Sequence, residues 1–183
     1  MRDHGNNGIV AGLRPEKLPQ PLLIDLLKTY CRLYYAMDGF WYLSVRNRFG
    51  DDSAVELDLW VWRKQAKYEM DHLTRLLGIQ GDDVASFMKA FGASPWFINL
   101  EYDVELDGKD RAVFSVTRCP TLEALEKEGN GRESRHCQTV EPAIFKFYAD
   151  YFNPAIEVRG LVVPPRKNRT GLCCKWEFKL ERG

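Results

Sequence analysis

Three cysteines in the second half of the chain occupy positions where a thiol can react or bind a metal. Cys119 ends a predicted strand just before a helix, Cys137 lies at the start of a longer helix, and Cys174 points inward from the last strand. Because helix N-termini favour negative charge, Cys119 and Cys137 are candidate catalytic thiolates. Together with His136, the three thiols would supply the four donors of a tetrahedral site for zinc or another divalent metal.

Simple packing is the main alternative for these thiols, because a free cysteine often behaves as a small buried apolar residue. The separations between positions 119, 137 and 174 also differ from the close cysteine pairs of structural zinc sites. Inert packing, a metal site and a nucleophilic or ligand-binding thiol therefore stand as three alternatives.

His136 and Glu141 form a candidate acid–base pair. His136 is adjacent to Cys137 and one turn before Glu141, so its imidazole could act as general base for a catalytic thiol, with Glu141 orienting the ring. The alternative is that His136 is a solvated residue at a helix entry. The sequence contains no serine triad context, phosphate-binding glycine loop or dinucleotide fingerprint.

Aromatic residues make up 13% of the chain and could line an apolar ligand pocket. We expect Trp41 and Trp60, near a helix junction, to contact a ligand together with Cys174 and Trp176 of the last strand. The alternative is that most of these rings pack in the core.

The first half of the chain has the apolar period of helices. Three helices are predicted, over residues 21–45, 53–77 and 83–91. Ser53 and Glu56 fit a capping box at the start of the second helix, and Asp82 or Asp83 caps the third.

The second half alternates with a two-residue period typical of strands. Strands are predicted over 96–106, 112–117, 156–163 and 172–180, with Cys173 outward on the last, and helices over 121–128 and 136–152. This order predicts an α+β domain, with an antiparallel sheet of about four strands built from two hairpins and covered by N-terminal and inserted helices. The predicted domain spans 21–183, with a helical half (21–92) and a sheet-and-helix half (95–181), after a flexible arm (1–20).

Composition limits the class of partner. The 26 basic and 26 acidic residues cancel, which argues against nucleic-acid binding, and no apolar run reaches the ~18–20 residues needed to span a bilayer. The N-terminal residues lack the apolar core of a signal peptide, so a cytoplasmic location with reduced cysteines is expected. The aromatic-rich helices suggest a homodimer.

Short motifs resemble those of the L-2-amino-thiazoline-4-carboxylic acid hydrolase-like family. They are Thr117-Arg118-Cys119-Pro120, then Glu126 to Gly129, then Cys137, then Cys174-Lys175-Trp176-Glu177-Phe178, in a resemblance that covers about residues 35–180. By resemblance, the activity is the opening of a thiazoline ring by water to give an N-carbamoyl-cysteine, and the three cysteines are shared positions. Lys175 departs from the acidic residue that commonly follows the last cysteine in that family.

Three hypotheses follow. The first is a cytoplasmic small-molecule-binding domain that hydrolyses a C=N or amide-like bond in a cysteine-lined site, with a thiolate or a metal-bound water as the attacking group. The second is a non-catalytic ligand-binding or sensor module. The third is a structural zinc-binding domain.

Overall fold

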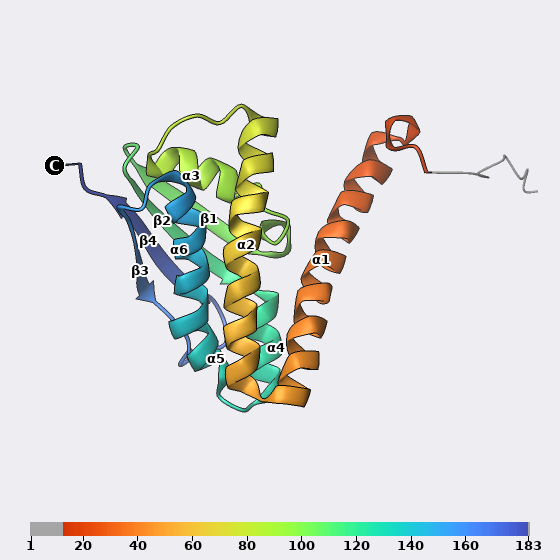
Figure 1. Cartoon of the computed structure of the whole chain (residues 1–183), viewed down its shortest axis with the longest axis vertical. Coiled ribbons are helices and arrows are strands. Elements are labelled where there is room, and N and C mark those ends of the chain that lie inside the picture. Colours follow the sequence, from red (N-terminus) through yellow and green to blue (C-terminus); the bar gives the residue numbers. More distant parts are fainter. Residues whose placement is uncertain (1–12, 183) are drawn as a thin grey trace, which may run out of the picture.

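A four-stranded antiparallel sheet forms one outer layer of the protein, and helices are stacked on one of its faces (Figure 1). The computed structural model describes residues 13–182. Helices α3 (Val84–Phe91) and α6 (Glu141–Phe152) contact the sheet, α2 (Asp51–Leu77) packs on α6, and α1 (Gln20–Phe49) lies outermost. The predicted α+β class is confirmed, but α3 is the N-terminal helix that packs on the sheet, whereas α2 and α1 lie in more distant layers.

The sheet has the strand order β1 (Glu101–Asp107), β2 (Arg111–Arg118), β4 (Cys174–Leu180) and β3 (Ile156–Val162). It therefore consists of two antiparallel pairs joined through β2 and β4, as the sequence predicts. Pairing of Phe114 with Trp176 and of Ala112 with Phe178 places these side chains on the helix-covered face. The other face is polar, and there Arg111 Nε donates a hydrogen bond of 2.9 Å to Glu177 Oε1.

The first strand begins later than its alternating pattern suggests. Trp96 and Phe97 are buried at a short 3₁₀ turn (Phe97–Asn99), and the extended backbone starts only at Glu101. Both rings pack edge-on against Phe91, with centroid distances of 5.1 and 4.8 Å. The prediction of a strand from Trp96 is wrong because core packing, which a two-residue period cannot distinguish from sheet pairing, holds these aromatic residues in a turn.

Helices α1 and α2 are separated by a single glycine. Gly50 has a φ of 87°, and α2 begins directly after it at Asp51. Ser53 and Glu56 therefore lie inside the helix, and the predicted capping box is not formed. Other predicted ends are confirmed: Gly78 takes the left-handed conformation after α2, and Asp83 Oδ1 accepts a 2.8 Å hydrogen bond from Ser86 N at α3.

A π-helical turn interrupts the long helix that was predicted from His136. A short 3₁₀ turn (Pro15–Lys17) precedes α1. The helices that follow β2 are α4 (Pro120–Glu128) and α5 (Arg132–Arg135). The π-helical turn (His136–Val140) follows α5 and leads into α6. Pro142, near the start of α6, has no N–H to donate to the Gln138 carbonyl four residues earlier, so the regular ladder is broken there.

The core lies between the sheet and α3, α6 and α2, and α1 contributes little to it. Phe145 of α6 lies at its centre, with its ring 5.0 Å from that of Trp176 and 5.5 Å from that of Phe91. Cys31 is the one fully buried side chain of α1. Within residues 13–182, no helix combines the length and apolar character that crossing a bilayer requires. Residues 1–12 of the predicted arm lie outside the described residues.

Candidate functional site

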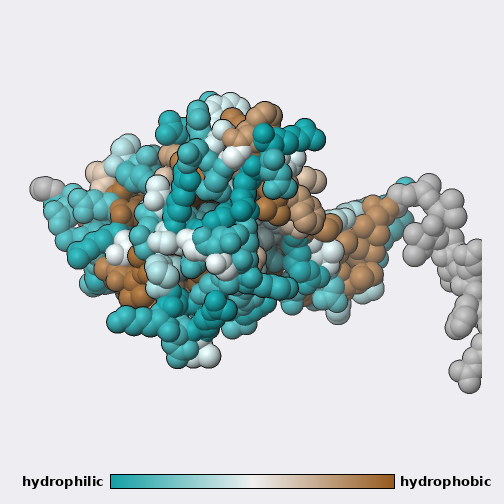
Figure 2. Space-filling view, turned by 90° about the horizontal axis from the view of Figure 1, so that it is seen from below, coloured by the Kyte–Doolittle hydropathy of each residue, from teal (hydrophilic) through white to brown (hydrophobic). Residues whose placement is uncertain are grey.

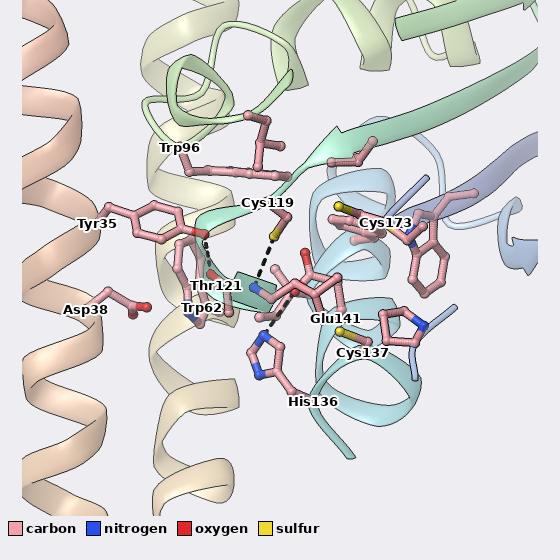
Figure 3. Close-up of a pocket in the computed structure, with 18 of the residues that line it drawn as sticks. Tyr35, Asp38, Trp62, Trp96, Cys119, Thr121, His136, Cys137, Glu141 and Cys173 are labelled. Carbon is pink, nitrogen blue, oxygen red and sulfur yellow. Dashed lines mark hydrogen bonds and ion pairs between the residues drawn. The ribbon is translucent and has the colours of Figure 1, made fainter. Parts of the chain in front are cut away.

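A pocket lies where α1, α2, α4, the π-helical turn and the covered face of β2 and β4 meet (Figure 3). It encloses about 930 Å³ when the space at its open mouth is included. Aromatic rings form much of its wall, namely those of Tyr34, Tyr35, Trp62, Trp96, Phe114 and Trp176. Only about 100 Å³ of this space can hold the centre of a water-sized sphere, but its mostly apolar lining with a few polar groups is typical of sites for small organic molecules.

The pocket brings together the cysteines that the sequence singled out. Cys119, Cys137 and Cys174 all line it, and so does Cys173, which the strand pattern predicted to point outward. Cys173 precedes the first paired residue of β4, so the strand alternation does not extend to it. Its side chain is buried, and Sγ donates to the Thr117 carbonyl at 3.2 Å.

The thiols are held in their neutral form. Burial raises the pKa of Cys119 to about 12, although Cys119 is the N-cap of α4 and accepts a long hydrogen bond from Leu122 N. Burial also raises the pKa of Cys137 and of Cys174. Cys137 lies in the π-helical turn, not at a helix start. The expected stabilisation of a thiolate by a helix N-terminus is therefore outweighed by desolvation.

The four predicted metal ligands do not form a metal centre. Cys119, Cys137, Cys174 and His136 line one pocket and come from the N-cap of α4, the π-helical turn and β4. In the part of the chain that the structure describes, no group of three or more His, Cys, Asp or Glu side chains is placed to hold a metal ion. The predicted zinc site is corrected accordingly.

The predicted pairing of His136 with Glu141 is present. His136 Nε2 lies 3.3 Å from Glu141 Oε2, and both residues line the pocket. Burial alone would lower the pKa of His136, but the hydrogen bond and charge of Glu141 outweigh it, with smaller contributions from Asp58 and Asp38. The net effect raises the pKa of His136 above its ordinary value.

Two carboxyl groups that were not predicted complete the site. Asp38 projects from α1 (Figure 3). Asp58 belongs to α2, and both residues line the pocket. Burial raises the pKa of Asp38 to about 6 and that of Asp58 to about 7, where the Asp38 carboxyl adds to the effect of burial. Asp58 is only 3% exposed, and its Oδ1 atom has no hydrogen-bond partner among the described residues.

Trp41 and Trp60, which were predicted to contact the ligand, do not line the pocket. Their exposed fractions are 37% and 61%, and the pocket is lined instead by Trp62 and Trp96. Two positions along a helix turn the side chain by about 200°, so Trp60 faces away from the side on which Trp62 lies. Cys174 and Trp176, the other two predicted ligand contacts, do line it.

A sequence signal existed for the missed carboxylates. Asp58 lies at the helical spacing of the buried residues Ala54 and Ala66 and of Trp62, so it is an acidic residue on a core-facing stripe. Asp38 follows Tyr34 by one turn on the inward face of α1. An acid in such a position needs a partner or a function, because burying an unpaired carboxylate is costly.

Helix α1 is tied to the rest of the site by hydrogen bonds. The Tyr35 and Thr121 hydroxyls are hydrogen-bonded, which joins α1 to α4 across the pocket (Figure 3). Tyr34 OH donates to Glu69 Oε2 of α2 at 3.3 Å. One wall of the pocket therefore belongs to a helix that is otherwise largely exposed.

The fold and the site define an α+β protein with an aromatic, carboxyl-bearing pocket between a helical hairpin and a sheet. The chain belongs to a family of unknown function (DUF6125), which it matches over residues 16–180. The matched region contains every residue that lines the pocket. No curated protein and no solved structure matches the chain.

Proposed function

We propose that this protein binds a small molecule carrying an amidine-like C=N group and hydrolyses that group with water. The observation that carries the proposal is the charge of the pocket. Its wall carries three acidic residues, Asp38, Asp58 and Glu141. Among the described residues of the wall, the basic side chain is His136, and no Lys or Arg is present.

The acidic lining of the pocket favours a cationic ligand. A protonated amidine or isothiourea would give Asp58 Oδ1 a partner, and leaving that buried oxygen unpaired is costly. The faces of Trp62 and Trp96 also suit a cation. A carboxylate ligand would instead enter a site that already holds three carboxyl groups, where like charges repel in a low dielectric.

The pocket also provides uncharged hydrogen-bond donors. The indole nitrogens of Trp96 and Trp176 are buried and have no hydrogen-bond partner among the described residues. Such N–H groups suit the oxygen that develops when water adds to a C=N carbon. The pocket therefore contains carboxyl acceptors for the nitrogen of the ligand and indole donors for the oxygen that develops during the reaction.

The resemblance to thiazoline-carboxylate hydrolases supports the same type of reaction. In that reaction, the neutral form of His136, oriented by Glu141, would take a proton from water as the oxygen bonds to the C=N carbon. The π electrons move to the ring nitrogen, the added oxygen loses its second proton to solvent as it forms the carbonyl, and the carbon–sulfur bond breaks. The sulfur leaves with the proton held by His136, so the cationic ligand and one water give the ring-opened thiol and one released proton. Because the described residues of its pocket wall include no Lys or Arg for a carboxylate, we propose that this chain acts on a ligand without that group.

Water is the proposed nucleophile because the thiols are neutral at physiological pH. Burial raises the pKa of Cys119 to about 12, so its thiolate is scarce. The same observation favours a second candidate, a non-catalytic ligand-binding or sensor module in which the cysteines are part of the pocket wall. We further propose a cytoplasmic location, which the five free cysteines support.

Two matched probes test the proposal: 2-amino-2-thiazoline, a cation at neutral pH, and 2-amino-thiazoline-4-carboxylate, which adds a carboxylate. Binding is followed by the fluorescence of the pocket tryptophans, and hydrolysis by mass spectrometry of the ring-opened thiol. We expect the first probe to bind at least tenfold more tightly and to be converted to N-(2-mercaptoethyl)urea.

The control variants separate the site from the surface. Asp58→Asn should lose binding of the cationic probe, whereas Asp52→Asn, at an exposed position on the same helix, should not. Binding without conversion above the rate in buffer would overturn hydrolysis in favour of the sensor module. Tighter binding of the carboxylate probe, or no binding of either, would overturn the ligand assignment.

A further inference from the structure

Helix α1 has an apolar flank that nothing in the described chain covers. We define this flank by seven side chains that lie on one side of the helix and are between 37% and 69% exposed, namely Leu22, Leu23, Tyr30, Leu33, Met37, Phe40 and Trp41. Hydrophobic residues gather on the part of the surface that α1 forms, at the right of the view (Figure 2). All seven flank residues are apolar or aromatic, unlike a normal solvated helix face.

The position of α1 in the fold makes this exposure unusual. The helix is 30 residues long, yet it fully buries only Cys31, and it diverges from α2 toward its N-terminal end (Figure 1). Most helical stability in proteins comes from packing of an apolar face. The inward face of α1 packs on α2 and the pocket, so the flank needs a second packing partner.

We propose that the α1 flank binds the same flank of a second copy of this chain, forming a symmetric homodimer. The exposed area of the flank is large enough to bind a second copy. Its seven half-exposed large side chains offer on the order of 700 Å² per copy, close to the ~800 Å² per partner of a standard interface. The spacing of Tyr30, Leu33, Met37 and Phe40, in steps of three and four, is that of helix pairs.

The composition of the flank also favours a second copy over other partners. Obligate interfaces, above all those of homodimers, are more apolar than transient interfaces and resemble a domain core cut in half. Two-fold symmetry lets one apolar patch cover its own counterpart, and such dimers are the commonest oligomers. Two α1–α2 hairpins joined in this way would form a four-helix bundle.

The dimer would hold in place the part of the pocket wall that α1 forms. Tyr35 and Asp38 lie on the inward face of α1, so the pocket keeps them only while α1 stays docked. A second copy that packs on the flank would hold α1 from its other side. Dimer formation and ligand binding would then stabilise each other, because both require the same position of α1.

Sedimentation of the full chain between ~1 and ~100 µM tests the interface. The wild type should sediment as a dimer of two 21.2 kDa chains, and Met37→Glu and Phe40→Glu should each sediment as a monomer. Arg32→Glu, an exposed position on the polar side of α1, is the matched control and should remain dimeric. Circular dichroism checks that each variant keeps its helix content.

Several outcomes would overturn the proposal. A wild-type chain that is monomeric at every concentration tested would exclude the dimer. If that monomer cosediments with phosphatidylcholine vesicles, the flank would be assigned to a lipid surface instead. Dimers of Met37→Glu and Phe40→Glu would place the interface elsewhere.

The coupling to the pocket, which rests on the proposed function, has its own readout. Met37→Glu should weaken binding of 2-amino-2-thiazoline about tenfold, a difference of about 1.4 kcal/mol. Equal affinity of monomer and dimer would overturn the coupling while leaving both the dimer and the proposed function in place. Failure of the wild type to bind the probe would overturn the function without affecting the sedimentation result.

Discussion

His136 Nε2 lies 3.3 Å from Glu141 Oε2 across the π-helical turn. In a regular α-helix, residues five apart are separated by about 140° around the axis and do not face each other. The wider π-helical turn rotates them onto the same side, and Pro142 breaks the regular hydrogen-bond ladder at this point. A local irregularity of the backbone therefore creates the candidate base of the site.

Replacing Glu141 by Gln should lower the pKa of His136, because the carboxylate and its hydrogen bond are what hold it above its ordinary value. A raised histidine pKa stabilises the fold below the unfolded-state value, about 6.5, and this contribution is lost as the pH rises through the folded value. An NMR titration of the His136 ring measures the shift. Glu123→Gln, on exposed α4 surface, should leave the titration unchanged. An unchanged His136 pKa in Glu141→Gln would contradict the pairing.

The sheet and most helix ends could be predicted because they depend on local patterns. The alternation in β4 and the stop signals at Gly78 and Gly92 each act within a few residues. The site could not be predicted as a whole, since periodicity identifies a buried stripe but not what covers it. Trp60 and Trp62 show the difference: both are aromatic residues of α2, and only the tertiary position of α6 and the sheet decides which one lines the pocket.

Asp58 should make the protein less stable as the pH rises through the range from about 4 to 7. Its pKa is about 7 in the folded protein, so the native state retains a proton that the unfolded chain, with a pKa near ~3.9, releases. The native state therefore loses stability across this window, by on the order of 4 kcal/mol in total.

Urea unfolding of wild type and Asp58→Asn at pH 5 and pH 8 measures this effect. The variant should show a flatter pH dependence and a gain relative to wild type at pH 8, whereas exposed Asp52→Asn should follow the wild type. A wild-type slope that persists in Asp58→Asn would assign the pH dependence to other groups.

The pocket thiols should react slowly with alkylating reagents in the native protein. With a pKa of about 12, Cys119 has a thiolate fraction at pH 8 that is roughly 10³-fold below that of an ordinary cysteine with a pKa near ~8.5. Time-resolved mass spectrometry with iodoacetamide should show slow labelling in buffer and rapid labelling of all five cysteines in guanidinium. Rapid native labelling of Cys119 or Cys137 would instead restore the nucleophilic-thiol hypothesis.

The ion pair between Arg166 and Glu126 should be a principal tether of the loop between β3 and β4. Both side chains are under 10% exposed, Arg166 makes hydrogen bonds of 2.8 and 2.7 Å to the two Glu126 oxygens, and its Nη1 reaches Cys173 Sγ at 3.4 Å. Arg166→Met leaves the Glu126 carboxylate with only the exposed Arg169, whose Nε lies 4.0 Å away, so we expect a loss of about 3 kcal/mol, the lower end of the range for breaking a buried pair.

Adding Glu126→Leu to Arg166→Met should recover much of that loss, since it removes the unpaired charge. The Arg166 hydrogen bonds lower the pKa of Glu126, so the contribution of the pair is complete above the unfolded-state value of ~4.3 and is lost as the pH falls through the folded value. Lys67→Met, which breaks an exposed pair with Asp71, should change the free energy of unfolding by less than ~1 kcal/mol. Urea unfolding at pH 7 compares the three variants. An equally small effect of Arg166→Met would mean that the pair does not hold the loop. Cys173 would then be kept in the pocket wall by its contact with the Thr117 carbonyl and by the hydrogen bond from its N–H to the Val116 carbonyl.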